Sequence, residues 1–313
     1  MTPPDTPATP ASPDPHEPAH PTELIELLAT LDAEPAPASV RDAVLVGVRR
    51  APHVPVAPMP PLDVFEHCVD ALGQVLDEVL DDPPAAADPF DRRVDAYGWT
   101  VAELIHHLVA IERYTRSALG LEPDEGDPDR LDHLAVGRAL RAELARRPTS
   151  DAIHTWRADA LATIDALRAG RGPAPGSVVQ LHQWPFGVDS LLIVRSFELW
   201  THADDVRRAT GRRLDAPPPA ALRAMSTASV QSLPLLASVL AGRQQMPGVR
   251  VVLTGAGGGT HDIGDGPRAT TVVADVVDYC RLVARRVDAS VFAVEGHPTI
   301  TEDLVAAAQA FAM

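Results

Sequence analysis

The residues best suited to chemistry lie in the segment Glu198-Leu-Trp-Thr-His202-Ala-Asp-Asp205. Glu198 and His202 are four residues apart, so on a helix their side chains share one face. That face is apolar at Leu191 and becomes polar towards Asp205. Burial of a carboxylate and an imidazole is costly unless something pairs with them. A metal ion would do so, because a carboxylate and an imidazole one turn apart are a common pair of ligands on a helix.

A doubled histidine, His106-His107, offers a third ligand. His107 is in line with apolar residues of its own segment, namely Leu104, Leu108 and Ile111. His106 is in line with a more polar set, namely Glu103, Ala110 and Arg113. The period of a helix therefore predicts that His107 points inward and His106 outward. Two histidines and one carboxylate are three protein ligands, which leaves a position for water or substrate.

These residue types have plainer interpretations too. A Glu-x-x-x-His pair on a helix can be a solvated salt bridge, and a single inward histidine can be a hydrogen-bonded core residue. The pattern alone leaves the metal site and these two alternatives open.

Four amphipathic segments are predicted to position these residues. Apolar residues recur at three- and four-residue steps from Val64 to Val79 and again from Trp99 to Leu119. Thr100 and Glu103 have the spacing of a capping box. A third helix is predicted over 151–169, opened by Ser150 or Asp151 and ended by Gly170, and a fourth over 188–210, ended by Gly211. Together they predict a four-helix bundle over residues 62–212.

The period changes after residue 213, and a small α+β domain is predicted over 213–313. Strands are expected at 249–254, 269–274 and 291–294, and helices at 217–243, 275–287 and 301–311. The glycine cluster Gly255-Ala-Gly-Gly-Gly259 follows a strand, so it could cradle a phosphate. No helix follows it, however, and we favour a hairpin whose return arm is 260–266.

The first 61 residues look different from the rest. Residues 1–21 are rich in Pro, Ala, Thr and Asp and are predicted to be disordered. Residues 22–61 hold two short apolar stretches between proline-rich joints, and we interpret them as a helical appendage.

Composition excludes several classes of protein. The net charge of −16 disfavours nucleic-acid binding. The sequence has no Lys, which excludes Schiff-base and Walker A chemistry, and no Asn; both absences are typical of a GC-rich genome. Neither a secretory signal nor a membrane-spanning stretch is visible, so a cytoplasmic protein is expected. Cys68 and Cys280 are far apart, have no base motif beside them, and are expected to be buried and structural.

Two motifs resemble the mycothiol-dependent maleylpyruvate isomerase family. They are Trp99-Thr-Val-Ala-Glu-Leu-Ile-His-His107-Leu and the longer stretch from Arg195 to Gly211 that contains Glu198, His202 and Asp205. The stretches 251–259, 278–286 and 308–312 also resemble the family, so the likeness covers residues 62–313. It implies a DinB-like metal-binding helical bundle followed by a small α/β domain similar to sterol-carrier proteins.

The resemblance implies a divalent metal, usually zinc, held by His107, Glu198 and His202. It also implies mycothiol, a low-molecular-weight thiol of GC-rich actinobacteria, as cosubstrate. A cation beside a thiol favours the thiolate. A metal-bound thiolate could then add to a small electrophile and leave, which is isomerisation, or stay attached, which is S-transfer. Asp205 is expected to support the site, either behind a ligand or as a partner of Arg207 or Arg208.

A dianionic substrate such as maleylpyruvate needs local positive charge in an acidic protein. Arg281 and Arg285 are four residues apart in a predicted helix and could bind a carboxylate, with Arg285 favoured for this role and Arg281 for an ordinary surface ion pair. Two alternatives stay open. One is a metal-dependent hydrolase, for which no His-Glu-x-x-His motif supplies a base; the other is a non-catalytic metal- or ligand-binding regulatory protein.

Overall fold

The computed structural model describes residues 56–81, 88–94, 98–122, 140, 142–181, 184–212, 215–241 and 246–311. The predicted disordered tail and most of the predicted appendage lie outside these residues. Among the described residues, no helix is both long and apolar enough to cross a bilayer.

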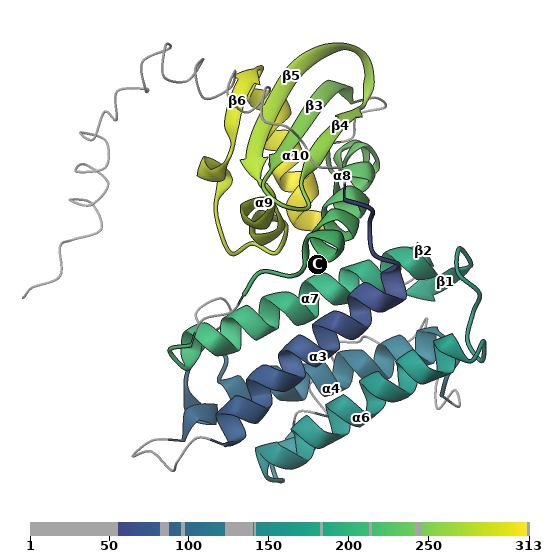
Figure 1. Ribbon diagram of the computed structural model, residues 1–313, viewed down its shortest axis with the longest axis vertical. Helices are drawn as coiled ribbons and strands as arrows, with labels where there is room; N and C mark the ends of the chain where they lie inside the picture. Colours follow the sequence, from purple (N-terminus) through teal and green to yellow (C-terminus); the bar gives the residue numbers. More distant parts are fainter. Residues whose placement is uncertain are drawn as a thin grey trace, which may run out of the picture. The chain divides into compact units, whose positions relative to one another are not determined.

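Four long helices form the bundle that the sequence predicts (Figure 1). They are α3 (Pro61–Leu80), α4 (Val101–Ala118), α6 (Thr149–Arg168) and α7 (Val188–Ala209). Helix α3 packs on α7 and α6, and α4 packs on α6 and α7. Their apolar faces meet in one core, in which Phe65, Trp156 and Phe197 are fully buried.

The helix ends follow from local chemistry in most cases. Thr100 accepts a hydrogen bond from the backbone N–H of Glu103, whose carboxylate accepts one from the Thr100 N–H, so the predicted capping box is present. Gly170 and Gly211 follow α6 and α7 with φ of 67° and 73°, the left-handed conformation that ends a helix. The predicted start of α6 at Ser150 or Asp151 is wrong, because the helix begins at Thr149 after Pro148, with no side-chain cap.

A short hairpin precedes α7. Strand β1 (Val178–Leu181) pairs antiparallel with β2 (Trp184–Gly187). This hairpin was not predicted, since the segment has no clear alternation and carries Pro185 within a strand.

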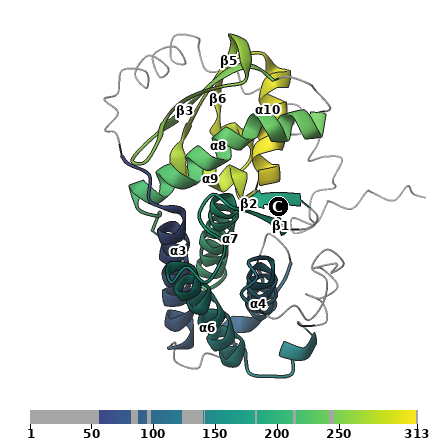
Figure 2. The same ribbon diagram turned by 90° about the vertical axis from the view of Figure 1, so that its right-hand side faces the viewer.

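The C-terminal region has helix α8 (Pro219–Ala241), a four-stranded sheet and two further helices (Figure 2). The sheet order is β4-β3-β5-β6, where β3 is Pro247–Thr254, β4 Gly259–Ile263, β5 Asp265–Asp275 and β6 Ala293–Gly296. Strand β3 is parallel to β5 and antiparallel to β4, and β5 is antiparallel to β6. The predicted hairpin around the glycine cluster is confirmed, because Leu253 pairs with Gly259 across it.

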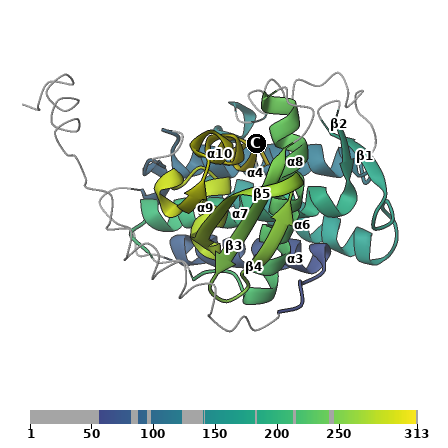
Figure 3. The ribbon, with the colours of Figure 1, turned by 90° about the horizontal axis from the view of Figure 1, so that it is seen from above.

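Helices α8, α9 (Val276–Val283) and α10 (Pro298–Phe311) pack on one another and on the sheet (Figure 3). Val249, Val251 and Leu253 of β3 are buried at alternate positions, which is the pattern of a sheet covered on one face. The predicted helix over 275–287 is too long, since α9 ends at Val283. The predicted strand at 291–294 is shifted, since β6 starts at Ala293.

Candidate metal centre

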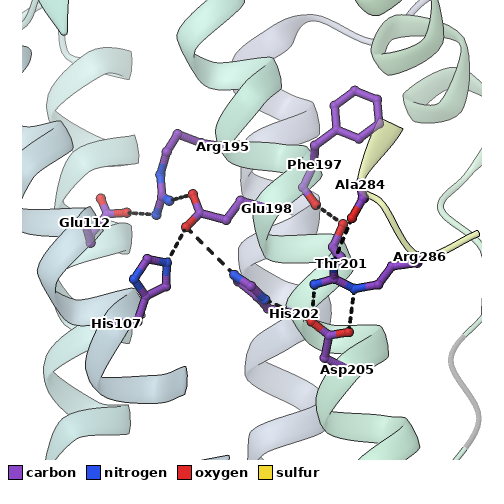
Figure 4. Close-up of polar contacts among 10 residues, drawn as sticks. All are labelled: His107, Glu112, Arg195, Phe197, Glu198, Thr201, His202, Asp205, Ala284 and Arg286. Carbon is purple, nitrogen blue, oxygen red and sulfur yellow. Dashed lines mark hydrogen bonds and ion pairs between the residues drawn. The ribbon is translucent and has the colours of Figure 1, made fainter. Parts of the chain in front are cut away.

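Three side chains from two helices converge inside the bundle (Figure 4). His107 comes from α4, and Glu198 and His202 come from α7. The Nε2 atom of His107 lies 3.0 Å from Oε1 of Glu198, and Nε2 of His202 lies 3.9 Å from the same oxygen. One possible ligand atom from each residue lies within 4.8 Å of the other two. The structure thus brings together the three residues that the sequence singled out.

Local structure fixes this arrangement. Glu198 and His202 are one turn apart on α7, so both project from the same face. The capping box sets where α4 begins and therefore which way His107 points. Trp99 lies beside His107, with ring centroids 5.3 Å apart, and the rings of His107 and His202 meet edge to face at 5.8 Å.

The prediction for His106 is wrong. His106 is only 4% exposed, so it does not point to solvent. Helix α4 packs on α6 as well as on α7, which covers more of its circumference than one apolar stripe indicates. His107 is nevertheless the histidine that faces Glu198.

Glu198 is held by a buried cation. The Arg195 guanidinium donates from Nη1 to Oε2 of Glu198 and from Nη2 to Oε2 of Glu112, the latter over 3.2 Å. Burial alone would raise the pKa of Glu198, but Arg195, His107 and His202 outweigh it and hold the pKa well below its usual range. The carboxylate is therefore ionised, as a metal ligand must be.

His202 is oriented from its other side. Its Nδ1 lies 3.1 Å from Oδ2 of Asp205. Burial on its own would raise the pKa of Asp205, but hydrogen bonds from His202 and Arg286 outweigh it and lower the pKa. An ionised Asp205 can only accept, so Nδ1 of His202 carries the proton and Nε2 presents its lone pair towards Glu198. Burial also lowers the pKa of His202, which keeps the imidazole neutral near pH 7.

The partner of Asp205 beyond His202 is Arg286, from the C-terminal region. Arg286 donates from Nε over 2.8 Å and from Nη2 over 2.6 Å to the two oxygens of Asp205. The predicted alternative partners bind elsewhere, because Arg207 binds Glu78 and Arg208 binds Asp204.

A cavity of about 430 Å³ lies next to this pair. It is lined by Arg93, Val94, Asp205, Arg208, Ala209, Arg285 and Arg286. Four of the seven residues are arginines, so the cavity suits an anionic ligand. Asp205 lines the cavity and also contacts Nδ1 of His202, so this one carboxylate links the cavity to the candidate metal centre.

Arg285 lines this cavity, but not for the reason that the sequence indicated. Arg281 and Arg285 do not share a helix face as predicted, because α9 ends at Val283 and Arg285 has a left-handed φ of 58°. Arg285 donates from Nε to the Gln309 carbonyl over 3.2 Å. Arg281 forms the ordinary surface ion pair expected of it, with Nη1 lying 3.5 Å from Oδ1 of Asp278.

Both cysteines are buried and unpaired with each other, as expected. Burial raises the pKa of the Cys68 thiol to about 12, and burial also raises the pKa of Cys280. Neither thiol is suited to act as a nucleophile at neutral pH.

The contacts that Glu112, Arg195 and Arg286 make around the candidate metal centre were not predicted from the sequence. The spacing of Arg195 three residues before Glu198 was a usable signal, since it places both on one face. Glu112 and Arg286 are 86 positions before and 88 positions after Glu198, and nothing local in the sequence connects them to it.

The donor set fits a divalent transition metal. It offers two imidazole nitrogens and a carboxylate oxygen, with His202 neutral and Glu198 ionised. Three such ligands with a further position open are the usual arrangement of a catalytic zinc site. A second layer that orients a histidine through a carboxylate is also typical of metal sites.

Fold and site together define a four-helix bundle with a two-histidine, one-glutamate cluster, joined to a small α/β region. Residues 69–207 match the family described as the mycothiol maleylpyruvate isomerase N-terminal domain. This match confirms the resemblance drawn from the sequence motifs for residues 69–207. No curated protein sequence matches the chain.

Two solved structures share the fold. One is the crystal structure of the mycothiol-dependent maleylpyruvate isomerase, and the other is a variant of that enzyme in which a histidine is replaced by alanine. Each is 16% identical to this chain and has a TM-score of 0.51. Each match covers 76% of this chain and 92% of the solved structure's chain.

Proposed function

We propose that this chain is a metal- and mycothiol-dependent enzyme that acts on a small electrophile. The reaction is either isomerisation of the maleylpyruvate type or S-transfer of the thiol. The observation that carries the proposal is the convergence of His107, Glu198 and His202 within a domain of this family. These three residues would hold one divalent ion, and we propose zinc because the donor set is two nitrogens and one carboxylate oxygen.

Bound there, the metal would favour the thiolate form of a thiol beside it. The sulfur comes from outside the chain, because Cys68 and Cys280 are buried and their pKa values are raised. The protein's own side chains would hold the metal ligands in place and bind the substrate. Asp205 and Arg195 fix the ligands, and the arginine-lined cavity, with Arg285 among its residues, would bind the carboxylates of an anionic substrate.

The test combines metal analysis with turnover. The purified protein is assayed for zinc and for conversion of maleylpyruvate with and without mycothiol, with isomer and thiol adduct measured separately. We expect about one zinc per chain and turnover that needs the thiol. His107→Ala should lose both, whereas His154→Ala, which removes an exposed histidine of α6, should lose neither.

The other outcomes distinguish the alternatives. Consumption of an electrophile without thiol, with neither isomer nor adduct formed, would support a metal-dependent hydrolase. One zinc per chain with no turnover of any electrophile tried would support a regulatory or binding protein. A protein that binds no divalent metal would overturn the proposal itself.

A further inference from the structure

On the Oε2 side of Glu198, a chain of charges runs through Arg195 to Glu112 of α4 (Figure 4). Arg195 contacts Glu198 with one terminal nitrogen and Glu112 with the other. The Arg195 side chain is 3% exposed and that of Glu112 is 0% exposed. Charged groups are seldom buried so completely unless they are paired, because their desolvation is costly.

Glu112 is itself anchored from the far side. Thr163 of α6 donates to Oε1 of Glu112 over 2.7 Å, and Arg116 donates from Nη1 to the Thr163 hydroxyl over 3.3 Å. Both oxygens of Glu112 are thus engaged, one by Thr163 and one by Arg195. The guanidinium has little freedom to move, since its two terminal nitrogens are bound to two buried or half-buried carboxylates.

The consequence falls on the two oxygens of Glu198. Oε2 is occupied by Arg195, whereas Oε1 faces His107 and His202. We propose that Arg195, anchored by Glu112, is a positioning residue that confines Glu198 to a single oxygen ligand and so makes the site selective for zinc-like ions. This inference rests on the proposed metal site.

The selectivity follows from ligand number. Ca²⁺ takes six to eight oxygen ligands, and Mg²⁺ prefers an octahedral oxygen shell. A carboxylate limited to one oxygen, beside two imidazoles, instead suits a four-coordinate ion with one open position. If Oε2 were released, Glu198 could bind through both oxygens, and the coordination number would rise.

Cobalt(II) is the probe, because its visible absorption is intense in four-coordinate sites and weak when the coordination number is higher. The test variant is Glu112→Gln with Arg195→Met, which removes one negative and one positive charge and leaves the net charge unchanged. Stoichiometry, cobalt spectrum and competition between zinc and manganese are measured on the full chain. The matched control is Glu78→Gln with Arg207→Met, which removes an ion pair between α3 and α7 that touches none of the three ligands.

We expect the test variant to bind one cobalt with clearly weaker absorption. Its zinc affinity should fall about 10- to 100-fold, as for other second-layer partners, and its preference for zinc over manganese should fall with it. The control should match the parent. If the test variant does not fold, Arg195→Lys is used, because an ammonium keeps the charge but cannot bridge both carboxylates.

A test variant with the same cobalt spectrum and the same metal preference as the parent would overturn the inference. So would a folded variant that binds no cobalt, since Arg195 would then create the ligand and not restrict it. A parent protein that binds neither cobalt nor zinc would mean that the proposed function has failed, and the inference with it.

Discussion

The Nδ1 atom of His202 lies 3.1 Å from Oδ2 of Asp205, and both side chains are less than 5% exposed. A buried carboxylate in this position fixes the tautomer and the ring orientation of the histidine. Asp205→Asn keeps the shape but removes the charge. We expect zinc affinity to fall about 10- to 100-fold, measured by competition with a chelator. Unchanged affinity would mean that Asp205 supports the fold and not the ligand.

The two adjacent histidines of α4 should behave differently when replaced. His107→Ala should lose the metal, because His107 faces Glu198. His106→Ala should keep it but lower the free energy of unfolding by about 0.5–3 kcal/mol, the usual range for a buried side chain. Metal content and urea denaturation of the metal-free proteins separate the two effects. Metal loss in the His106 variant alone would mean that the ligand is His106 and not His107.

Two replacements of Arg285 separate its backbone from its side chain. The left-handed φ of 58° costs a non-glycine residue about 1–2 kcal/mol. Arg285→Gly should therefore be more stable than Arg285→Ala by about 1 kcal/mol. Both remove the guanidinium from the cavity, so both should raise KM for a dianionic electrophile equally. A rise in KM in only one variant would point to backbone geometry and not to charge.

The two cysteine thiols should be unreactive in the native protein. With the pKa of Cys68 raised to about 12 and that of Cys280 also raised, both thiols stay protonated at pH 8.5. An alkylating reagent should modify neither in buffer and both in denaturant, as judged by mass. The Cys68→Ala, Cys280→Ala protein should keep its thiol-dependent turnover. Activity lost only in this variant would make one of the two the nucleophile.

Added thiol should set the pH dependence of turnover. The proposed reaction uses the thiolate, so the rate should fall as the pH drops and the thiolate is protonated. A cation beside the sulfur favours deprotonation, so this fall should occur below the free thiol's pKa of about 8.5. Rate is measured against pH in the parent and in the double cysteine variant. A profile that stays the same when the thiol is omitted would argue against thiolate chemistry.

Local signals explain how well the bundle could be predicted. The capping box of Thr100 and the glycines at 170 and 211 mark helix ends through backbone chemistry that the sequence shows directly. The end of α9 was missed because the left-handed position is occupied by Arg285, where glycine would be the usual signal.

In the site, too, features with a local sequence signal were predicted and features that depend on packing were not. Glu198 and His202 were found because one helix turn relates them. The exposure of His106 was mispredicted because periodicity along a single helix does not reveal how many neighbours pack around it. The contact of Arg195 with Glu112 joins residues 83 positions apart, so it depends on how α4 and α7 pack and not on either segment alone.

Two contacts tie α7 to the C-terminal region. The Asp205–Arg286 ion pair is nearly buried, and the rings of Phe197 and Phe311 meet at 5.7 Å. If either region unfolded alone, it would leave a buried charge without its partner and an aromatic face in water, both unfavourable. Calorimetry should therefore record one cooperative transition for residues 56–311, with equal calorimetric and van't Hoff enthalpies.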